Sequence, residues 1–298
     1  MRARATLIAT IVLALAAAAC SAPTSTTAPG PGGTAVSGTV PAGSLTMPPV
    51  PPATDPPGVH RFNTYWMRDC PTPELATEVV GCRLAIGESR TTPSDDVARA
   101  AVEALMAGPD PAETADHLGT NIRDVATLNS LKVEGDLATI DFNRYFETAK
   151  TRPQTAQVVY ALTQFPNIKR VQILVDNITN GAIGANPLTR ADVAEFTPPI
   201  LIESPTLNAT VPHRFKVTGT AVSADREMHY RIETPDGAKH REGTAPLLGP
   251  EGQRGTVLIP ITIPAEISGP VILLVYEAGD TGPATEVTTP ARIPLVVA

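Results

Sequence analysis

The sequence is poor in aromatic residues and in positive charge. Phe, Trp and Tyr make up only 4% of its 298 residues, and 23 Lys and Arg stand against 30 Asp and Glu, which gives a net charge of −7. A phosphate backbone attracts basic surfaces and unpaired bases stack on aromatic rings, so both shortages argue against nucleic-acid binding. We therefore expect no nucleic acid among the partners.

The sequence also lacks the short motifs of the common enzyme classes. It has no Gly-x-Ser-x-Gly elbow, no His-Glu-x-x-His pair, no P-loop and no dinucleotide-binding glycine fingerprint. The adjacent Asp95 and Asp96 fit the cap of a helix better than acid–base chemistry. The five histidines form no ligand pair at helical spacing; they are His60, His117, His213, His229 and His240. We expect a protein that is not an enzyme and that holds neither a metal ion nor a cofactor.

Cysteine is scarce, and the first of the three cysteines ends an N-terminal targeting segment. Arg2 and Arg4 precede an apolar run over residues 6–19, which is too short to span a bilayer comfortably and has the length of a signal-peptide core. Cys20 follows three alanines in a pattern that resembles the bacterial lipobox, whose cysteine becomes diacylated. We expect a signal peptide over residues 1–19 and a lipid on Cys20. The alternative is an ordinary secretory signal with a chance cysteine.

The segment after Cys20 has the composition of a tether. Residues 21–59 contain 10 Pro, 6 Gly, 11 Ser or Thr and one charged residue, Asp55. Such a segment cannot bury enough apolar surface to offset its ordering entropy. We expect a lipoprotein whose disordered tether, residues 20–59, holds the folded part at the extracytoplasmic face of the cell membrane. A proline-rich ligand for a partner is the alternative.

The two remaining cysteines, Cys70 and Cys82, form an even pair in an oxidising compartment. A disulfide between them would pin a hairpin or an excursion loop between two strand-like runs. The competing interpretation is a metal site, which needs four ligands, and no histidine or further cysteine lies nearby at zinc spacing. We expect the disulfide.

Residues 60–195 show the pattern of a small α+β domain. A helix is expected to start at Thr92-Pro93, with Val97, Ala101, Ala104 and Leu105 on its buried stripe, and to end at Gly108. The other expected elements are strands over residues 62–67 and 79–86, a hairpin of 125–133 with 137–142, a helix over 152–165 and a strand over 170–175.

Four motifs within this region resemble one known domain family. They are Leu105 to Pro109 at a helix end, the Gly135 hairpin, Leu162-Thr163 in a helix, and the strand from Val171 to Val175. In this order they are similar to the GerM N-terminal-type (GerMN) domain of sporulation and spore germination proteins. The resemblance implies a GerMN-type α+β fold over residues 60–195.

From residue 198 onward helical periodicity disappears. Short apolar runs recur between turn residues, at 200–203, 214–222, 228–234, 256–263, 271–277 and 291–297. This spacing predicts a β-sandwich, and the region resembles the immunoglobulin-like domain that often follows GerMN domains. We expect an all-β immunoglobulin-like domain over residues 198–298, and we expect each of the two domains to fold alone.

These features together suggest a lipid-anchored, non-catalytic protein of the cell envelope. The family resemblance implies a protein-binding or scaffolding module in sporulation, germination or cell-wall processes, with envelope proteins as partners and self-association as a further option. The alternative is an accessory lipoprotein that binds a ligand or the cell wall. Arg outnumbers Lys 18 to 5, a bias typical of a GC-rich genome, so we expect an actinobacterial source.

Overall fold

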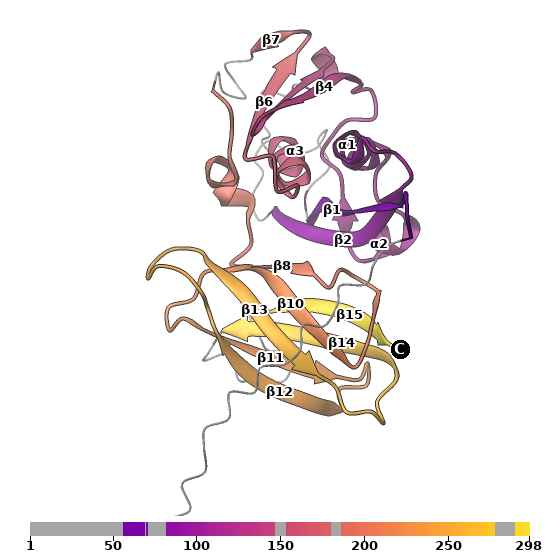
Figure 1. Ribbon diagram of the computed structural model, residues 1–298, viewed down its shortest axis with the longest axis vertical. Helices are drawn as coiled ribbons and strands as arrows, with labels where there is room; N and C mark the ends of the chain where they lie inside the picture. Colours follow the sequence, from indigo (N-terminus) through magenta and orange to yellow (C-terminus); the bar gives the residue numbers. More distant parts are fainter. Residues whose placement is uncertain (1–55, 69, 71–81, 147–152, 180–185, 278–289) are drawn as a thin grey trace, which may run out of the picture. The chain divides into compact units, whose positions relative to one another are not determined.

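A computed structural model describes residues 56–68, 70, 82–146, 153–179, 186–277 and 290–298 (Figure 1). Every described residue lies in one compact unit of the chain, which starts after residue 48. The predicted signal peptide, Cys20 and the tether up to Asp55 lie outside the described residues. No described helix is both long and apolar enough to cross a bilayer.

The first antiparallel sheet has the strand order β2-β1-β3. It contains β1 (His60–Arg68), β2 (Arg83–Thr92) and the short β3 (Leu118–Gly119). The second strand runs six residues further than the sequence pattern indicated, to Thr92, because Arg90, Thr91 and Thr92 still pair with β1. Since β1 pairs on both sides and β2 on one, β2 is an edge strand of this sheet.

The helix that follows starts later than the sequence predicted. Thr92 belongs to β2, and α1 (Val97–Ala107) is capped by Asp96, whose carboxylate accepts a hydrogen bond from the Arg99 amide at 3.1 Å. The expected Thr92 cap is therefore wrong, whereas assigning one of the two aspartates to capping is confirmed. A second helix, α2 (Pro111–Ala115), was not expected.

The second sheet has the order β4-β5-β6-β7. Its strands are β4 (Leu128–Glu134), β5 (Leu137–Phe142), β6 (Arg170–Val175) and β7 (Ile178–Thr179). Gly135 makes the β4–β5 turn at a φ of 60°, a conformation that glycine adopts without strain. The expected strands 137–142 and 170–175 match β5 and β6, which run parallel and are joined through η1 (Arg144–Phe146) and α3 (Pro153–Thr163).

Helix α3 lies between the two sheets, beside α1 (Figure 1). Every α3 residue from Pro153 to Leu162 is buried. Gln157, a buried polar residue of α3, is satisfied by backbone groups. The Gln157 side chain accepts from the Asn121 amide at 2.8 Å and donates to the Tyr65 carbonyl at 3.0 Å.

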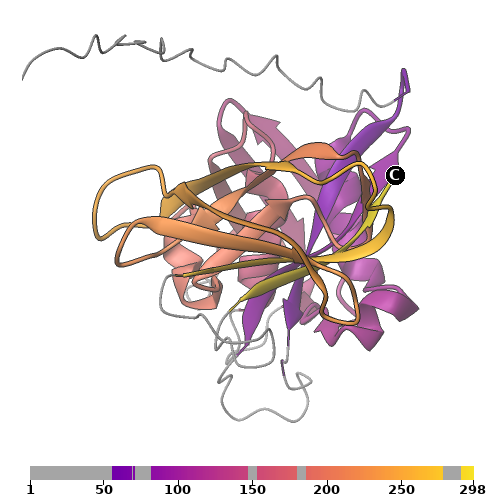
Figure 2. The ribbon, with the colours of Figure 1, turned by 90° about the horizontal axis from the view of Figure 1, so that it is seen from below.

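In the rest of the described chain, strands are the main regular elements. After η2 (Arg190–Phe196), an unexpected 3-10 segment, eight strands form two sheets of order β13-β10-β8 and β12-β11-β14-β15-β9. They are β8 (Ile200–Ser204), β9 (Ala209–Val211), β10 (Arg214–Ala221), β11 (Glu227–Glu233), β12 (Lys239–Pro246), β13 (Gly255–Thr262), β14 (Gly269–Glu277) and β15 (Ala291–Val297). All six expected runs are strands, and β9 and β12 are additional. Seen from below, these strands lie in front of the elements of residues 60–179 (Figure 2).

The inward side chains of these two sheets share one core. Val217 on β10 and Ile259 on β13 pack in the same buried cluster as Ile232 on β11 and Leu273 on β14, each at most 1% exposed. The same cluster continues into residues 62–175, so the described part of the chain has one contiguous main core and is mostly β-sheet with few helices.

Candidate functional site

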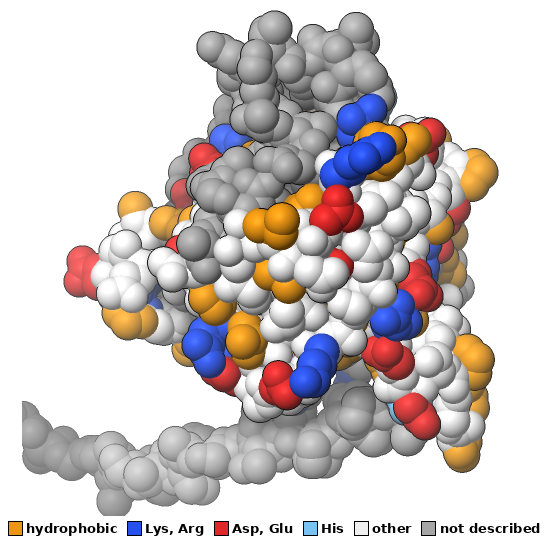
Figure 3. All heavy atoms as spheres, turned by 90° about the horizontal axis from the view of Figure 1, so that it is seen from above, with side chains coloured by type: hydrophobic (Ala, Val, Ile, Leu, Met, Phe, Trp, Pro, Cys, Tyr) orange, Lys and Arg blue, Asp and Glu red, His pale blue; other side chains and the backbone are white. Residues whose placement is uncertain are grey.

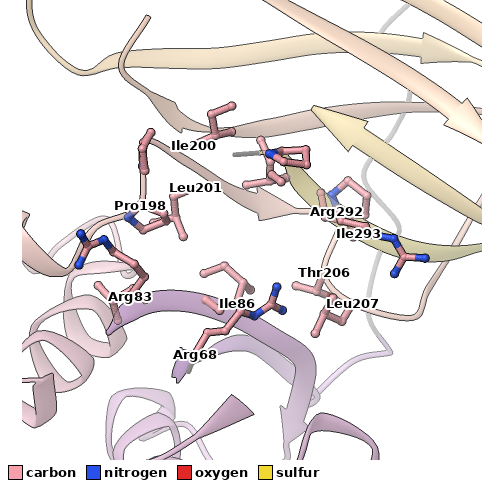
Figure 4. A pocket seen from close by; sticks show the side chains of 17 residues that line it. Arg68, Arg83, Ile86, Pro198, Ile200, Leu201, Thr206, Leu207, Arg292 and Ile293 are labelled. Atoms are coloured by element: carbon pink, nitrogen blue, oxygen red, sulfur yellow. The ribbon is translucent and has the colours of Figure 1, made fainter. Parts of the chain in front are cut away.

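A groove of about 480 Å³ lies between β2 and β8, and we call it the β2–β8 groove (Figure 4). Each of these strands is the edge of its own sheet. The start of β15 closes one side. The residues that line the groove are Arg68, Arg83, Leu84, Ala85, Ile86, Pro198, Pro199, Ile200, Leu201, Ile202, Pro205, Thr206, Leu207, Pro290, Ala291, Arg292 and Ile293.

Apolar side chains form the floor of the groove. Ile86 from β2 and Leu201 from β8 extend into the space between the two strands, and Ile293 lies on β15 beside them (Figure 4). The groove is thus mostly apolar, and among the described residues that line it only three arginines are charged. Its volume lies within the usual range for small-molecule sites.

The three arginines come from three strands. Arg68 ends β1, Arg83 begins β2, and Arg292 lies on β15. Arg68 and Arg83 are directly paired across the antiparallel ladder, so both side chains stand on the same face of the sheet. Like charges placed directly opposite each other on neighbouring strands destabilise a sheet.

No acidic residue offsets this charge within the described residues. None of the described residues that line the groove is Asp or Glu, and no described carboxylate forms an ion pair with any of the three arginines. The Arg83 guanidinium donates only to the carbonyl of neighbouring Cys82, at 2.9 Å. The Arg68 Nε is buried and has no hydrogen-bond partner. By contrast, the face that carries β4 to β7 shows basic and acidic side chains next to one another (Figure 3).

A disulfide adjoins the arginine pair. Cys70 and Cys82 are joined with a Cα–Cα distance of 4.7 Å, within the normal range for disulfides. Cys70 lies two residues beyond Arg68, and Cys82 directly precedes Arg83. The covalent bond therefore closes the end of the β1–β2 ladder next to the two arginines. Cys20, the predicted lipidation residue, lies outside the described residues.

A polar network lies on the other side of β8, where the chain passes from η2 to the second set of sheets. The Glu203 carboxylate accepts from Arg190 Nη1 at 2.8 Å and from the Tyr65 hydroxyl at 2.9 Å. The Arg190 guanidinium also lies over the Tyr160 ring, 4.4 Å from its centroid. Burial, together with the negative charge of Glu203, raises the pKa of Tyr65 well above its ordinary value. Because these groups satisfy one another, they brace the junction.

A second carboxylate is buried near the first sheet and was missed by the sequence reasoning. Glu113 on α2 is 1% exposed and accepts hydrogen bonds from Trp66 Nε1 at 2.7 Å, the Glu88 amide at 2.8 Å, Arg90 Nη2 at 2.9 Å and the Asp110 amide at 3.0 Å. Buried carboxylates are candidates for acid–base work. Here both oxygens are engaged by donors, so we interpret Glu113 as a brace between α2, β1 and β2.

No metal site emerges from the part of the chain that the structure describes. It contains no group of three or more His, Cys, Asp or Glu side chains placed to hold one ion. None of the five histidines lines the groove.

Comparison with known proteins bears on residues 65–180. These residues match the family model Germane, described as sporulation and spore germination. Residues 65–180 form a Germane domain. The resemblance drawn from the four sequence motifs is thus confirmed, and the domain supplies β1, β2 and two of the three groove arginines. The other wall, β8 and β15, lies outside the matched residues.

Solved structures similar to this chain include two from one sporulation protein. The tandem GerMN domains of GerM from Bacillus subtilis share 19% identity over 47% of this chain and 49% of theirs, with a TM-score of 0.37. The match therefore spans about half the length of that structure. The first GerMN domain of the same protein shares 19% identity over 34% of this chain and 84% of its own, with a TM-score of 0.27.

A putative lipoprotein from Clostridium perfringens is a further structural match. It shares 18% identity over 49% of this chain and 97% of its own length, with a TM-score of 0.31. No curated protein matches the chain.

Proposed function

We propose that this chain is a non-catalytic, lipid-anchored protein of the cell envelope that binds another envelope protein through the β2–β8 groove. The observation that carries the proposal is the set of three arginines around an apolar floor with no acidic partner among the described residues. Such a set costs stability in the free protein. A bound partner with negatively charged groups would offset this repulsion between the arginines.

The Germane domain supports a sporulation-type, non-catalytic role at the level of the family. Both oxygens of the buried Glu113 carboxylate accept hydrogen bonds from donors, which also favours a binding role over catalysis. The finer role, scaffolding during sporulation, germination or cell-wall assembly, is part of the proposal.

The placement of the protein follows from its N-terminus. A lipid on Cys20 would attach the chain to the extracytoplasmic face of the membrane, and the tether up to residue 59 would set its reach. We further assign residues 198–298 to an immunoglobulin-like sandwich. In that arrangement β8 and β15 supply the groove wall that the Germane domain lacks.

Site-specific photocrosslinking in intact cells tests this function. A photoreactive residue in place of Ala85, which lines the groove, is expected to give a discrete crosslinked product with one envelope protein. The same residue in place of Val133, which is 38% exposed on β4, serves as the control. The same products from both positions, or none from Ala85, would contradict the proposal. A product of twice the chain's mass would point to self-association.

The size of the groove also favours a second candidate, an accessory lipoprotein that binds a small ligand or a cell-wall polymer. A volume of about 480 Å³ with an apolar floor and a few charged groups suits a small anionic ligand. Cosedimentation of the protein with purified cell wall separates the candidates. Loss of cosedimentation in a chain with Arg68→Gln and Arg83→Gln would favour this second function.

A further inference from the structure

We infer that the occupant of the β2–β8 groove is an extended acidic segment of the partner, which adds as a strand along the free edge of β2 and sets its carboxylates against Arg68, Arg83 and Arg292. This inference rests on the proposed function and names the chemistry of the partner.

The β2–β8 groove runs along the edge of β2. Leu84, Ala85 and Ile86 are consecutive residues of β2, and all three line the groove. Successive side chains of a strand point to opposite faces of its sheet. A cavity that meets all three therefore runs along the edge of β2 and not over one face.

The groove also runs along the edge of β8, the strand that faces β2. Ile200, Leu201 and Ile202 are consecutive residues of β8, and all three line the groove from the other side. The groove is thus bordered by two strand edges. Such edges offer backbone donors and acceptors that pair with an extended peptide, whereas a helix has already paired its own backbone groups.

The charges around the groove also favour an acidic occupant. The net charge of the chain is −7, and arginines elsewhere in the described residues, such as Arg90, Arg170 and Arg190, pair with carboxylates. The three groove arginines do not pair with any described carboxylate. Since a guanidinium binds a carboxylate through two parallel hydrogen bonds, a row of acidic side chains complements them.

The groove has an apolar floor and a charged rim. Ile86, Leu201 and Ile293 provide apolar contact, whereas the arginine heads supply charge. A strand presents alternate residues to opposite sides. A segment that alternates acidic and apolar residues would satisfy both parts of the groove at once.

The disulfide supports this arrangement. By closing the end of the β1–β2 ladder, the Cys70–Cys82 bond holds Arg68 and Arg83 in register before the partner arrives. Less ordering is then needed on binding, which favours affinity.

The test uses the purified full chain in detergent and fluorescently labelled eight-residue peptides, with binding followed by fluorescence anisotropy. A peptide alternating glutamate and valine is expected to bind, and a peptide alternating lysine and valine is not. A peptide with four glutamates followed by four valines, and an alternating peptide N-methylated at every second residue, should both bind at least about tenfold more weakly.

Charge-reversing substitutions test whether the acidic peptide binds in the groove. Arg68→Glu with Arg83→Glu should weaken the acidic peptide at least about tenfold. Lys216→Glu with Arg241→Glu makes the same charge change at exposed residues outside the groove and should leave affinity within about twofold. If the charge-reversed chain loses its circular dichroism spectrum, Arg68→Gln with Arg83→Gln removes the charge more gently.

Several results would overturn the inference. Equal binding of the acidic and basic peptides, or equal binding by both charge-reversed chains, would refute the charge argument. Equal binding of the N-methylated peptide would refute strand addition. A crosslink from position 85 that persists unchanged in the charge-reversed chain would leave the proposed function standing and refute this inference, whereas no crosslink at all would refute the proposed function.

Discussion

The buried carboxylate of Glu113 gives a sharp test of what holds the Germane domain together. Its Oε1 accepts from Trp66 and the Glu88 amide, with the Thr64 hydroxyl as a longer third donor at 3.4 Å, and its Oε2 accepts from Arg90 and the Asp110 amide. Glu113→Gln keeps the shape but replaces one oxygen by an NH₂ group. In either orientation of the amide, two donors then face a donor.

The cost follows from these contacts. A hydrogen bond to a charged group contributes about 1.5–3 kcal/mol, and breaking a buried ion pair by removing one partner costs about 3–5 kcal/mol. Because the Arg90 guanidinium would lose its carboxylate, we expect Glu113→Gln to lower the free energy of unfolding by about 3–5 kcal/mol. For a protein whose total stability is about 5–15 kcal/mol, this loss is large.

Urea unfolding of the full chain, followed by far-ultraviolet circular dichroism, measures the effect. Glu134→Gln is the matched control, because Glu134 pairs with Lys132 at 2.8 Å with both side chains about 70% exposed. Such a surface pair contributes about 0–1 kcal/mol. If Glu113→Gln lowered stability by no more than Glu134→Gln, the interpretation of Glu113 as a brace would be wrong.

Four further outcomes are expected. Gly87→Ala should destabilise the same region, because a Cβ there would collide with Glu113 Oε1 and Trp66 Nε1, and its effect should not add to that of Glu113→Gln in a double variant. The hydrogen bond from Arg170 lowers the pKa of Asp136. The ionised Asp136 should therefore stabilise the fold at neutral pH, and this stabilisation should disappear as the pH falls through the lowered pKa. Unfolding at several pH values should show that Asp136→Asn loses this part of the pH dependence of stability. Cys20→Ala should release the protein from membranes or block its maturation, as fractionation after a high-salt wash would show. Residues 60–197 and 198–298, expressed apart, should each fold, and mixing them should raise their melting temperatures; a C-terminal piece that folds only in the mixture would contradict this.

The strands of residues 198–298 were predictable because alternation survives wherever one face of a strand is buried. On β13 every second residue is buried, and the expected run 256–263 differs from the strand by one residue at each end. β12 escaped prediction because it is an edge strand rich in charge, with Lys239, Arg241 and Glu242 exposed. Its pairing with β11, and not its own pattern, makes it a strand.

The interior of the Germane domain was less predictable. Helix α3 is buried from Pro153 to Leu162 although it carries the polar residues Gln154 and Gln157, so polarity along its sequence does not indicate burial. Glu113 did carry a signal, since Asp110, Pro111 and Glu113 form a capping box with proline at the first turn. That pattern predicts a short helix, but burial of the glutamate depends on Trp66 and Arg90, which lie far away in the sequence.

Only one wall of the groove could be predicted from local sequence patterns. The sequence places Arg68 and Arg83 beside the two cysteines, so a disulfide implies that the arginines are neighbours. Nothing local indicates that β8 and Arg292, more than 100 residues later, form the opposite wall.

The groove also ties the proposed function to the junction between the two parts of the chain. One wall comes from the Germane domain and the other from residues beyond it, so neither part alone contains the complete set of arginines and apolar residues. The network of Tyr65, Arg190 and Glu203 crosses that junction, and Glu203 lies on the same strand as Leu201 of the groove floor. This strand is thus held by the network on one side and lines the groove on the other. The proposed binding therefore needs both parts of the chain, and the Germane match alone does not specify the partner.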